Sequence, residues 1–195
     1  MVAGALVLIP MAFIPAGPAP IDFSAWVGSA VGLIADGDDK LYPQTRWFEL
    51  APAGWDPYAQ VRELRQQGTS LLDSDKRALQ LMKKTREIFD NAPINPVMEG
   101  ARVRIPGYVV PLDQNERGTS EFLLVPYFGA CIHTPAPPSN QIIHVRFERR
   151  QRGLRTMDNV WVAGVLKTAR SDTSMGRSSY AMEGRSIKPY VPPAR

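Results

Sequence analysis

The spacing of apolar and polar positions changes once along the chain, from a helical period to a strand-like period near residue 100. Between Ala78 and Phe89, apolar residues recur every three or four positions, which is typical of one helix face. This pattern predicts a helix that begins at Ser74 and ends before Asn91. A shorter helix is predicted over 58–67.

The second half of the chain predicts five short strands. Runs rich in β-branched and aromatic residues alternate with Gly, Pro and polar turn residues. The predicted strands cover 103–110, 121–128, 141–148, 160–166 and 180–190. Gly107, inside the first run, predicts a bulge or tight bend, and 170–178 reads as a loose loop. The expected fold class is therefore mainly β with an α-helical N-terminal extension, built on a small five-stranded OB-like barrel.

The order of these patterns predicts three segments. Residues 1–20 carry no charge and 2–14 are almost continuously apolar, so this segment is expected to be a signal peptide or an N-terminal anchor. Residues 21–97 form a lead-in with two helices, in which Trp47 and Trp55 are expected to pack against the main domain. Residues 98–195 form the OB-like barrel. We therefore expect an exported protein, periplasmic or membrane-associated.

Composition narrows the function classes only a little. The 195 residues are 44% hydrophobic and 22% charged, which is ordinary for a protein with a real core. A formal net charge of +4 permits contact with anionic surfaces but does not demand nucleic acid. One cysteine excludes an internal disulfide framework. The sequence contains no CxxC, HExxH or GxSxG motif.

The candidate chemistry lies in 120–147, which holds Cys131, His133 and His144. On an extended segment Cys131 and His133 point to the same side, and their sulfur and nitrogen atoms suit zinc or copper. Asp113 or Glu116, from the neighbouring hairpin turn, could supply a further ligand. His144 is expected on the solvent face, because the apolar residues on both sides of it should face the core.

Two alternatives to a metal link remain for the same stretch. Cys131 as a nucleophile with His133 as its base would make a thiol-dependent envelope enzyme. If Cys131 and His133 have no chemical role, the proline-rich loop 134–138 would be scaffolding or a docking surface for a partner protein. The expected loop and docking residues are Thr134, Pro135, Pro137, Pro138, Asn140, Gln141, Glu121 and Tyr127.

A basic segment follows the third predicted strand. Arg149, Arg150 and Arg152 could contact an anionic membrane surface. An OB-type barrel with such a loop could also bind single-stranded nucleic acid, a partner that an exported protein would not meet.

Three motifs give the chain a family resemblance. GYVVPL at 107–112, EFLLVPYFGACIHTPAPPSNQ at 121–141 and WVAGVL at 161–166 resemble the exported bacterial family called domain of unknown function three-two-nine-nine. The resemblance covers roughly 47–190. It implies export, and the placing of some relatives beside transporter and metal-uptake genes implies an envelope or transporter-associated partner.

Taken together, these patterns predict an exported envelope accessory or binding protein. A metal link through the Cys-x-His segment, with zinc or copper as the candidate metals, is one interpretation of this role, and we expect no catalysis. The thiol enzyme and the nucleic-acid binder are the alternatives.

Overall fold

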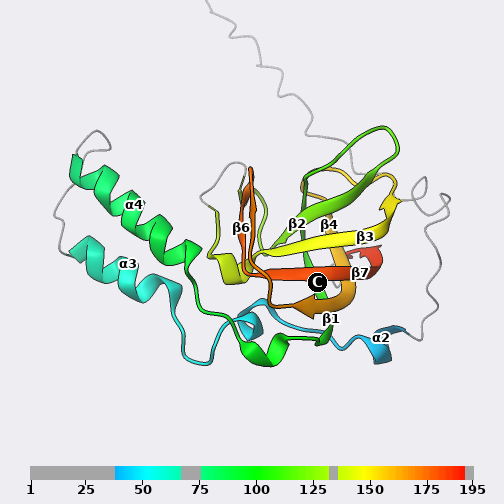
Figure 1. Ribbon diagram of the computed structural model, residues 1–195, viewed down its shortest axis with the longest axis horizontal. Coiled ribbons are helices and arrows are strands. Elements are labelled where there is room, and N and C mark those ends of the chain that lie inside the picture. Colours follow the sequence, from blue (N-terminus) through cyan, green and yellow to red (C-terminus); the bar gives the residue numbers. More distant parts are fainter. Residues whose placement is uncertain (1–37, 67–75, 132–135, 192–195) are drawn as a thin grey trace, which may run out of the picture. The chain divides into compact units, whose positions relative to one another are not determined.

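The computed structural model describes residues 38–66, 76–131 and 136–191 (Figure 1). The helices are α2 (Asp38–Leu41), η1 (Trp47–Leu50), α3 (Pro57–Gln66), α4 (Lys76–Asp90), η2 (Pro96–Met98) and η3 (Ser139–Gln141). The strands are β1 (Arg102–Pro111), β2 (Thr119–Val125), β3 (Ile143–Gln151), β4 (Asn159–Lys167), β5 (Ser171–Thr173), β6 (Gly176–Ser178) and β7 (Tyr180–Pro189). Within the described ranges, no helix is long and apolar enough to cross a membrane.

Five strands form a closed barrel in the order β1-β2-β3-β7-β4, and β4 pairs with β1 to close it. β3 and β7 run parallel, whereas the other neighbours are antiparallel. The expected fold class is therefore confirmed: the protein is mainly β, built on a five-stranded barrel of OB-like order with a helical N-terminal part. β5 and β6 form a separate hairpin in the connection from β4 to β7.

The barrel interior is filled by the alternate positions of its strands. In β1, alternate residues from Val103 to Val109 are buried, while the residues between them are partly exposed. Phe122 from β2 stacks on Phe147 from β3, with ring centroids 6.1 Å apart. This alternation is the pattern from which the strands were predicted.

A second apolar cluster lies on the outer side of the barrel. Its buried members are Val110, Leu123, Val125, Ala130 and Ile142. All four residues of 122–125 are buried, so β2 buries both of its faces. The segment after β2 and the β5–β6 hairpin cover the outer face, and the candidate site lies in this region.

The N-terminal part covers an open stretch of β1. β2 pairs with β1 only from Tyr108 onward. Beside the first half of β1, Gln44 forms a parallel bridge with Arg104. The indole of Trp47 donates a 2.7 Å hydrogen bond to the carbonyl of Pro106. Covering an unpaired strand edge in this way removes a template for unwanted pairing.

Two local predictions were wrong. Gly107 pairs with Val160 without a register shift, and the shifts fall at Thr119/Glu121 and Ala163/Gly164 instead. Gly107 is required by close packing, because a Cβ there would lie 2.8 Å from Leu124 Cγ. The predicted loose loop 170–178 contains the β5–β6 hairpin.

Candidate functional site

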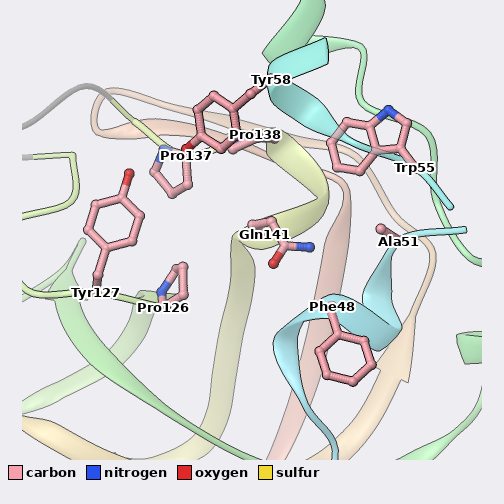
Figure 2. A pocket seen from close by; sticks show the side chains of 9 residues that line it. All are labelled: Phe48, Ala51, Trp55, Tyr58, Pro126, Tyr127, Pro137, Pro138 and Gln141. Atoms are coloured by element: carbon pink, nitrogen blue, oxygen red, sulfur yellow. The ribbon is translucent and has the colours of Figure 1, made fainter. Parts of the chain in front are cut away.

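A cavity of about 260 Å³ lies against the segment that follows β2 (Figure 2). It is lined by Phe48, Ala51, Trp55, Tyr58, Pro126, Tyr127, Pro137, Pro138 and Gln141. Four of the nine residues are aromatic and three are proline, so the lining is mainly flat apolar rings. Figure 2 shows these side chains arranged around the opening, with Gln141 between the two sides.

Three segments build this cavity, and they cover residues 48–58, 126–127 and 137–141. Phe48 belongs to η1, Tyr58 belongs to α3, and Tyr127 follows β2. Tyr58 is held by an edge-to-face contact with Phe89 of α4, with centroids 5.9 Å apart. Pro138 is the N-cap residue of η3. The turn is closed by a 2.7 Å hydrogen bond from the backbone amide of Gln141 to the carbonyl of Pro138.

Hydrogen bonds to the end of α4 and to the α4–η2 linker hold η3, which forms one wall of the cavity. The side chain of Asn140 is fully buried and donates a 2.7 Å hydrogen bond to the carbonyl of Pro93. Ser139 donates to the carbonyl of Asp90 at 3.2 Å. The wall is therefore held by residues about 47 positions away in the chain.

Several residues predicted for a docking surface come together here. Tyr127, Pro137, Pro138 and Gln141 all line the cavity, and Asn140 supports it from behind. Thr134 and Pro135 lie outside the described residues.

Glu121, also predicted for the docking surface, lies elsewhere, beside His144 on the outer side of β2 and β3. The expectation that His144 faces solvent was wrong. Its side chain is only 5% exposed, and its Nε2 lies 2.6 Å from Glu121 Oε1. The other ring nitrogen, Nδ1, lies 2.8 Å from the hydroxyl of Ser171. Alternation places His144 on the outer face as predicted, but the β5–β6 hairpin covers that face.

The charge state of this Ser171–His144–Glu121 chain follows from burial. Burial lowers the pKa of His144, and the hydrogen bond that its ring donates to Glu121 only partly opposes this effect. For Glu121, burial raises the pKa, but bonds from Arg146 and His144 lower it overall. A neutral imidazole that donates from Nε2 to the carboxylate accepts the Ser171 hydroxyl at Nδ1.

Cys131 packs as a partly buried thiol. Its pKa is raised by burial, and nearby Arg86 opposes the shift only in part. A raised pKa leaves less thiolate at neutral pH, which argues against an activated nucleophile. His133 lies outside the described residues, so the Cys131–His133 pair stays a prediction.

The carboxylate of Asp113 accepts hydrogen bonds from residues of its own hairpin turn. It accepts from Ser120 Oγ at 2.7 Å and from the amides of Ser120 and Glu121 at 3.0 Å each. Thr119 also donates to it, and Arg150 forms an ion pair at 3.0 Å. Among the described residues, no three or more His, Cys, Asp or Glu side chains form a group that could hold a metal ion.

The basic segment is only partly available to a partner. β3 continues through Gln151, so Arg149 and Arg150 lie on a strand. Arg150 donates to the backbone carbonyls of Asp113 and Gly118, and Arg149 and Arg152 are exposed.

Some residues of the site were not anticipated as such. Trp55 was expected only to pack, whereas Phe48 and Tyr58 carried no separate prediction. The exposure of their rings, 66% for Phe48 and 51% for Tyr58, is a tertiary property. The nearest signal in the sequence is the clustering of four aromatic residues, at 47, 48, 55 and 58.

The fold and the site define a small closed β-barrel of OB-like order with an aromatic and proline-lined cavity on its outer side. The chain belongs to the family described as "Protein of unknown function (DUF3299)", whose model matches residues 47–189. It is similar to a solved structure described as a DUF3299 family protein from Pseudomonas aeruginosa PAO1. The two are 30% identical with a TM-score of 0.56, over 77% of this chain and 97% of that chain. A search of curated proteins found no match.

Proposed function

We propose that this protein is a non-catalytic binding protein of the cell envelope, and that its cavity docks an extended, proline-containing segment of a partner protein. The observation that carries the proposal is the cavity lining, in which the rings of Phe48, Trp55, Tyr58 and Tyr127 face a space of about 260 Å³. Proline-rich segments bind in aromatic-lined grooves because the flat rings pack against pyrrolidine rings.

The shape of the ligand follows from the same chemistry. A polyproline II segment has no internal hydrogen bonds, so its carbonyls remain available to polar groups such as the side-chain amide of Gln141. Such a segment is already extended before it binds, and therefore loses little conformational entropy. The exposure of large rings beside the cavity, 66% for Phe48 and 39% for Tyr127, is typical of an interaction surface.

The envelope location is supported by the charge-free first 21 residues. An envelope or transporter-associated protein is therefore the proposed partner. The exposed Arg149 and Arg152 would favour a nearby anionic membrane. Fractionation of cells that express the full chain tests this part, and recovery in the cytosol would contradict it.

A peptide titration tests the docking proposal. Decaproline would be titrated against the protein while the fluorescence of its tryptophans is recorded, with a Gly-Ser peptide of equal length as the control ligand. We expect saturable binding of decaproline alone. Trp55→Ala and Tyr127→Ala should each weaken it about tenfold, which corresponds to about 1.4 kcal/mol. Heteronuclear NMR provides a second readout for Trp55→Ala, which removes one of the fluorophores.

Phe128→Ala is the matched control, because Phe128 is 65% exposed and adjacent to Tyr127 but is not part of the cavity lining. Equal weakening by Phe128→Ala would mean that exposed rings bind the peptide nonspecifically. That result, or equal binding of both peptides, would contradict the proposal.

A further inference from the structure

Three sulfur-containing side chains pack around one apolar cluster on the outer side of the barrel. Cys131, Met157 and Met175 contact the cluster of Val110, Leu123, Val125, Ala130 and Ile142. They come from three different connections: the segment after β2, the β3–β4 connection and the β5–β6 turn. All three are partly exposed, so an ion could reach them from solvent.

Two observations place the connections that carry the methionines beside the Cys131 turn. The amide of Gly129, two residues before Cys131, donates to Met157 Sδ at 3.2 Å. Gly176, which follows Met175, lies beside the thiol, since a Cβ there would be 3.6 Å from Cys131 Sγ. The Met157 thioether therefore contacts the turn that holds Cys131, and the residue after Met175 lies beside the thiol, while Met175 packs on the same cluster.

The backbone at two of these positions is also unusual. Cys131 and Met157 each have a φ of 67°, and within the described ranges they are the only residues other than glycine with a positive φ. Such a conformation is unfavourable for side chains of this kind and persists only where the surrounding structure holds it. Packing of the two sulfur side chains into one cluster provides that constraint.

We propose that Cys131, Met157 and Met175 form a binding site for Cu(I). Thiolate and thioether ligands are soft and select Cu(I), whereas zinc takes thiolate, imidazole and carboxylate ligands. This set contains one thiolate and two thioethers, which is a poor set for zinc and a suitable one for a soft monovalent ion. The site does not use the peptide cavity, so it stands whether or not the cavity binds a peptide.

Binding involves one proton and no change of oxidation state. The S–H bond of Cys131 breaks, a copper–sulfur bond forms, and the proton goes to solvent. Burial raises the pKa of the thiol, so the ion displaces this proton at neutral pH. The apparent affinity should therefore rise about tenfold per pH unit while the free thiol stays protonated.

A competition titration with Cu(I) tests the proposal. The purified full chain, without an affinity tag, would be titrated under anaerobic conditions against bicinchoninate, a coloured Cu(I) chelator. We expect one Cu(I) per chain. Cys131→Ser, Met157→Leu and Met175→Leu should each weaken binding at least about tenfold. Leucine conserves volume and removes the sulfur, so the methionine variants should still fold.

Met98→Leu is the matched control, because Met98 lies in η2 and is not among the residues that pack on this cluster. Thermal melts of every variant separate lost ligands from lost folding. Absence of stoichiometric Cu(I), or normal affinity in both methionine variants, would overturn the proposal. Loss of binding in His133→Ala with normal binding in both methionine variants would overturn it too, in favour of the Cys131–His133 pair.

Discussion

Asp113 shows, at the scale of one residue, how a single carboxylate holds a hairpin turn. Burial would raise its pKa, but hydrogen bonds from Thr119, Ser120 and the backbone at Glu121 lower the pKa to about 2. The native state therefore prefers the ionised carboxylate more strongly than the unfolded chain does, for which the reference pKa is 3.8. Stability from this group is present above pH 3.8 and is lost as the pH falls towards 2.

We predict that Asp113→Asn lowers the free energy of unfolding at pH 7 by about 1–2 kcal/mol, because the amide replaces a charged acceptor. As the pH falls from 3.8 towards 2, the wild-type protein loses the contribution of its ionised carboxylate, so the difference between the two proteins should narrow. Urea titrations at several pH values measure it. Glu116→Gln, an exposed change in the same turn, is the control and should alter stability by less than about 0.5 kcal/mol. A pH-independent difference for Asp113→Asn would contradict this role.

At the scale of elements, the β5–β6 hairpin has few residues of its own and depends on anchors to its neighbours. Ser171 bonds His144 on the barrel at 2.8 Å. Arg177 forms ion pairs with Asp172 on the hairpin and, at 3.4 Å, with Asp90 at the end of α4. An isolated two-stranded hairpin is marginally stable in water, so these anchors decide whether it stays on the barrel.

We predict that Ser171→Ala destabilises the protein by about 1–3 kcal/mol, because the buried Nδ1 of His144 loses its donor. Amide hydrogen exchange should accelerate in β5 and β6 more than in β7. The matched control is Ser174→Ala, an exposed serine in the same hairpin. Equal exchange in both variants would mean that the hydrogen bond does not anchor the hairpin.

The lowered pKa of His144 adds a pH dependence to the same anchor. Because the unfolded chain binds this proton more readily, stability should decrease as the pH falls below the reference value of 6.5, and level off below the native pKa.

At the scale of the whole molecule, one hydroxyl joins the N-terminal part to the barrel. The Tyr180 hydroxyl, on β7, donates a 2.6 Å hydrogen bond to the Leu50 carbonyl and accepts one at 2.8 Å from the Asn95 amide. Tyr180 and Leu50 have no exposed surface. Three segments up to 130 residues apart therefore meet at a single buried polar group.

We predict that Tyr180→Phe lowers the free energy of unfolding by about 1–3 kcal/mol, because it leaves the buried Leu50 carbonyl and the partly buried Asn95 amide without this partner. Limited proteolysis should then cut the N-terminal part sooner than the barrel. Tyr190→Phe serves as the control, since the ring of Tyr190 packs on Trp161 at the surface. If Tyr180→Phe has the stability of the wild type, the attachment of the N-terminal part to the barrel does not depend on this hydroxyl.

Local patterns predicted the elements closely. β1 was expected over 103–110 and runs over 102–111, and the helix expected over 58–67 runs over 57–66. Helical or strand periodicity and turn residues depend only on positions close together in the chain. A single sequence is therefore enough to predict the elements from them. The OB-like barrel class and the family also followed from the number of strands and from the motifs in 107–166.

The sequence by itself therefore determined the two longer helices, the five barrel strands, the OB-like class and the family. The tertiary structure decided which outer faces are covered. In the folded chain, His144 is buried and hydrogen-bonded to Ser171, and the carboxylate of Asp113 accepts hydrogen bonds from its own turn. Trp55 and Pro138 line one cavity. Alternation says which face of a strand a side chain occupies. Only the packing of distant segments decides whether that face meets water or another part of the chain.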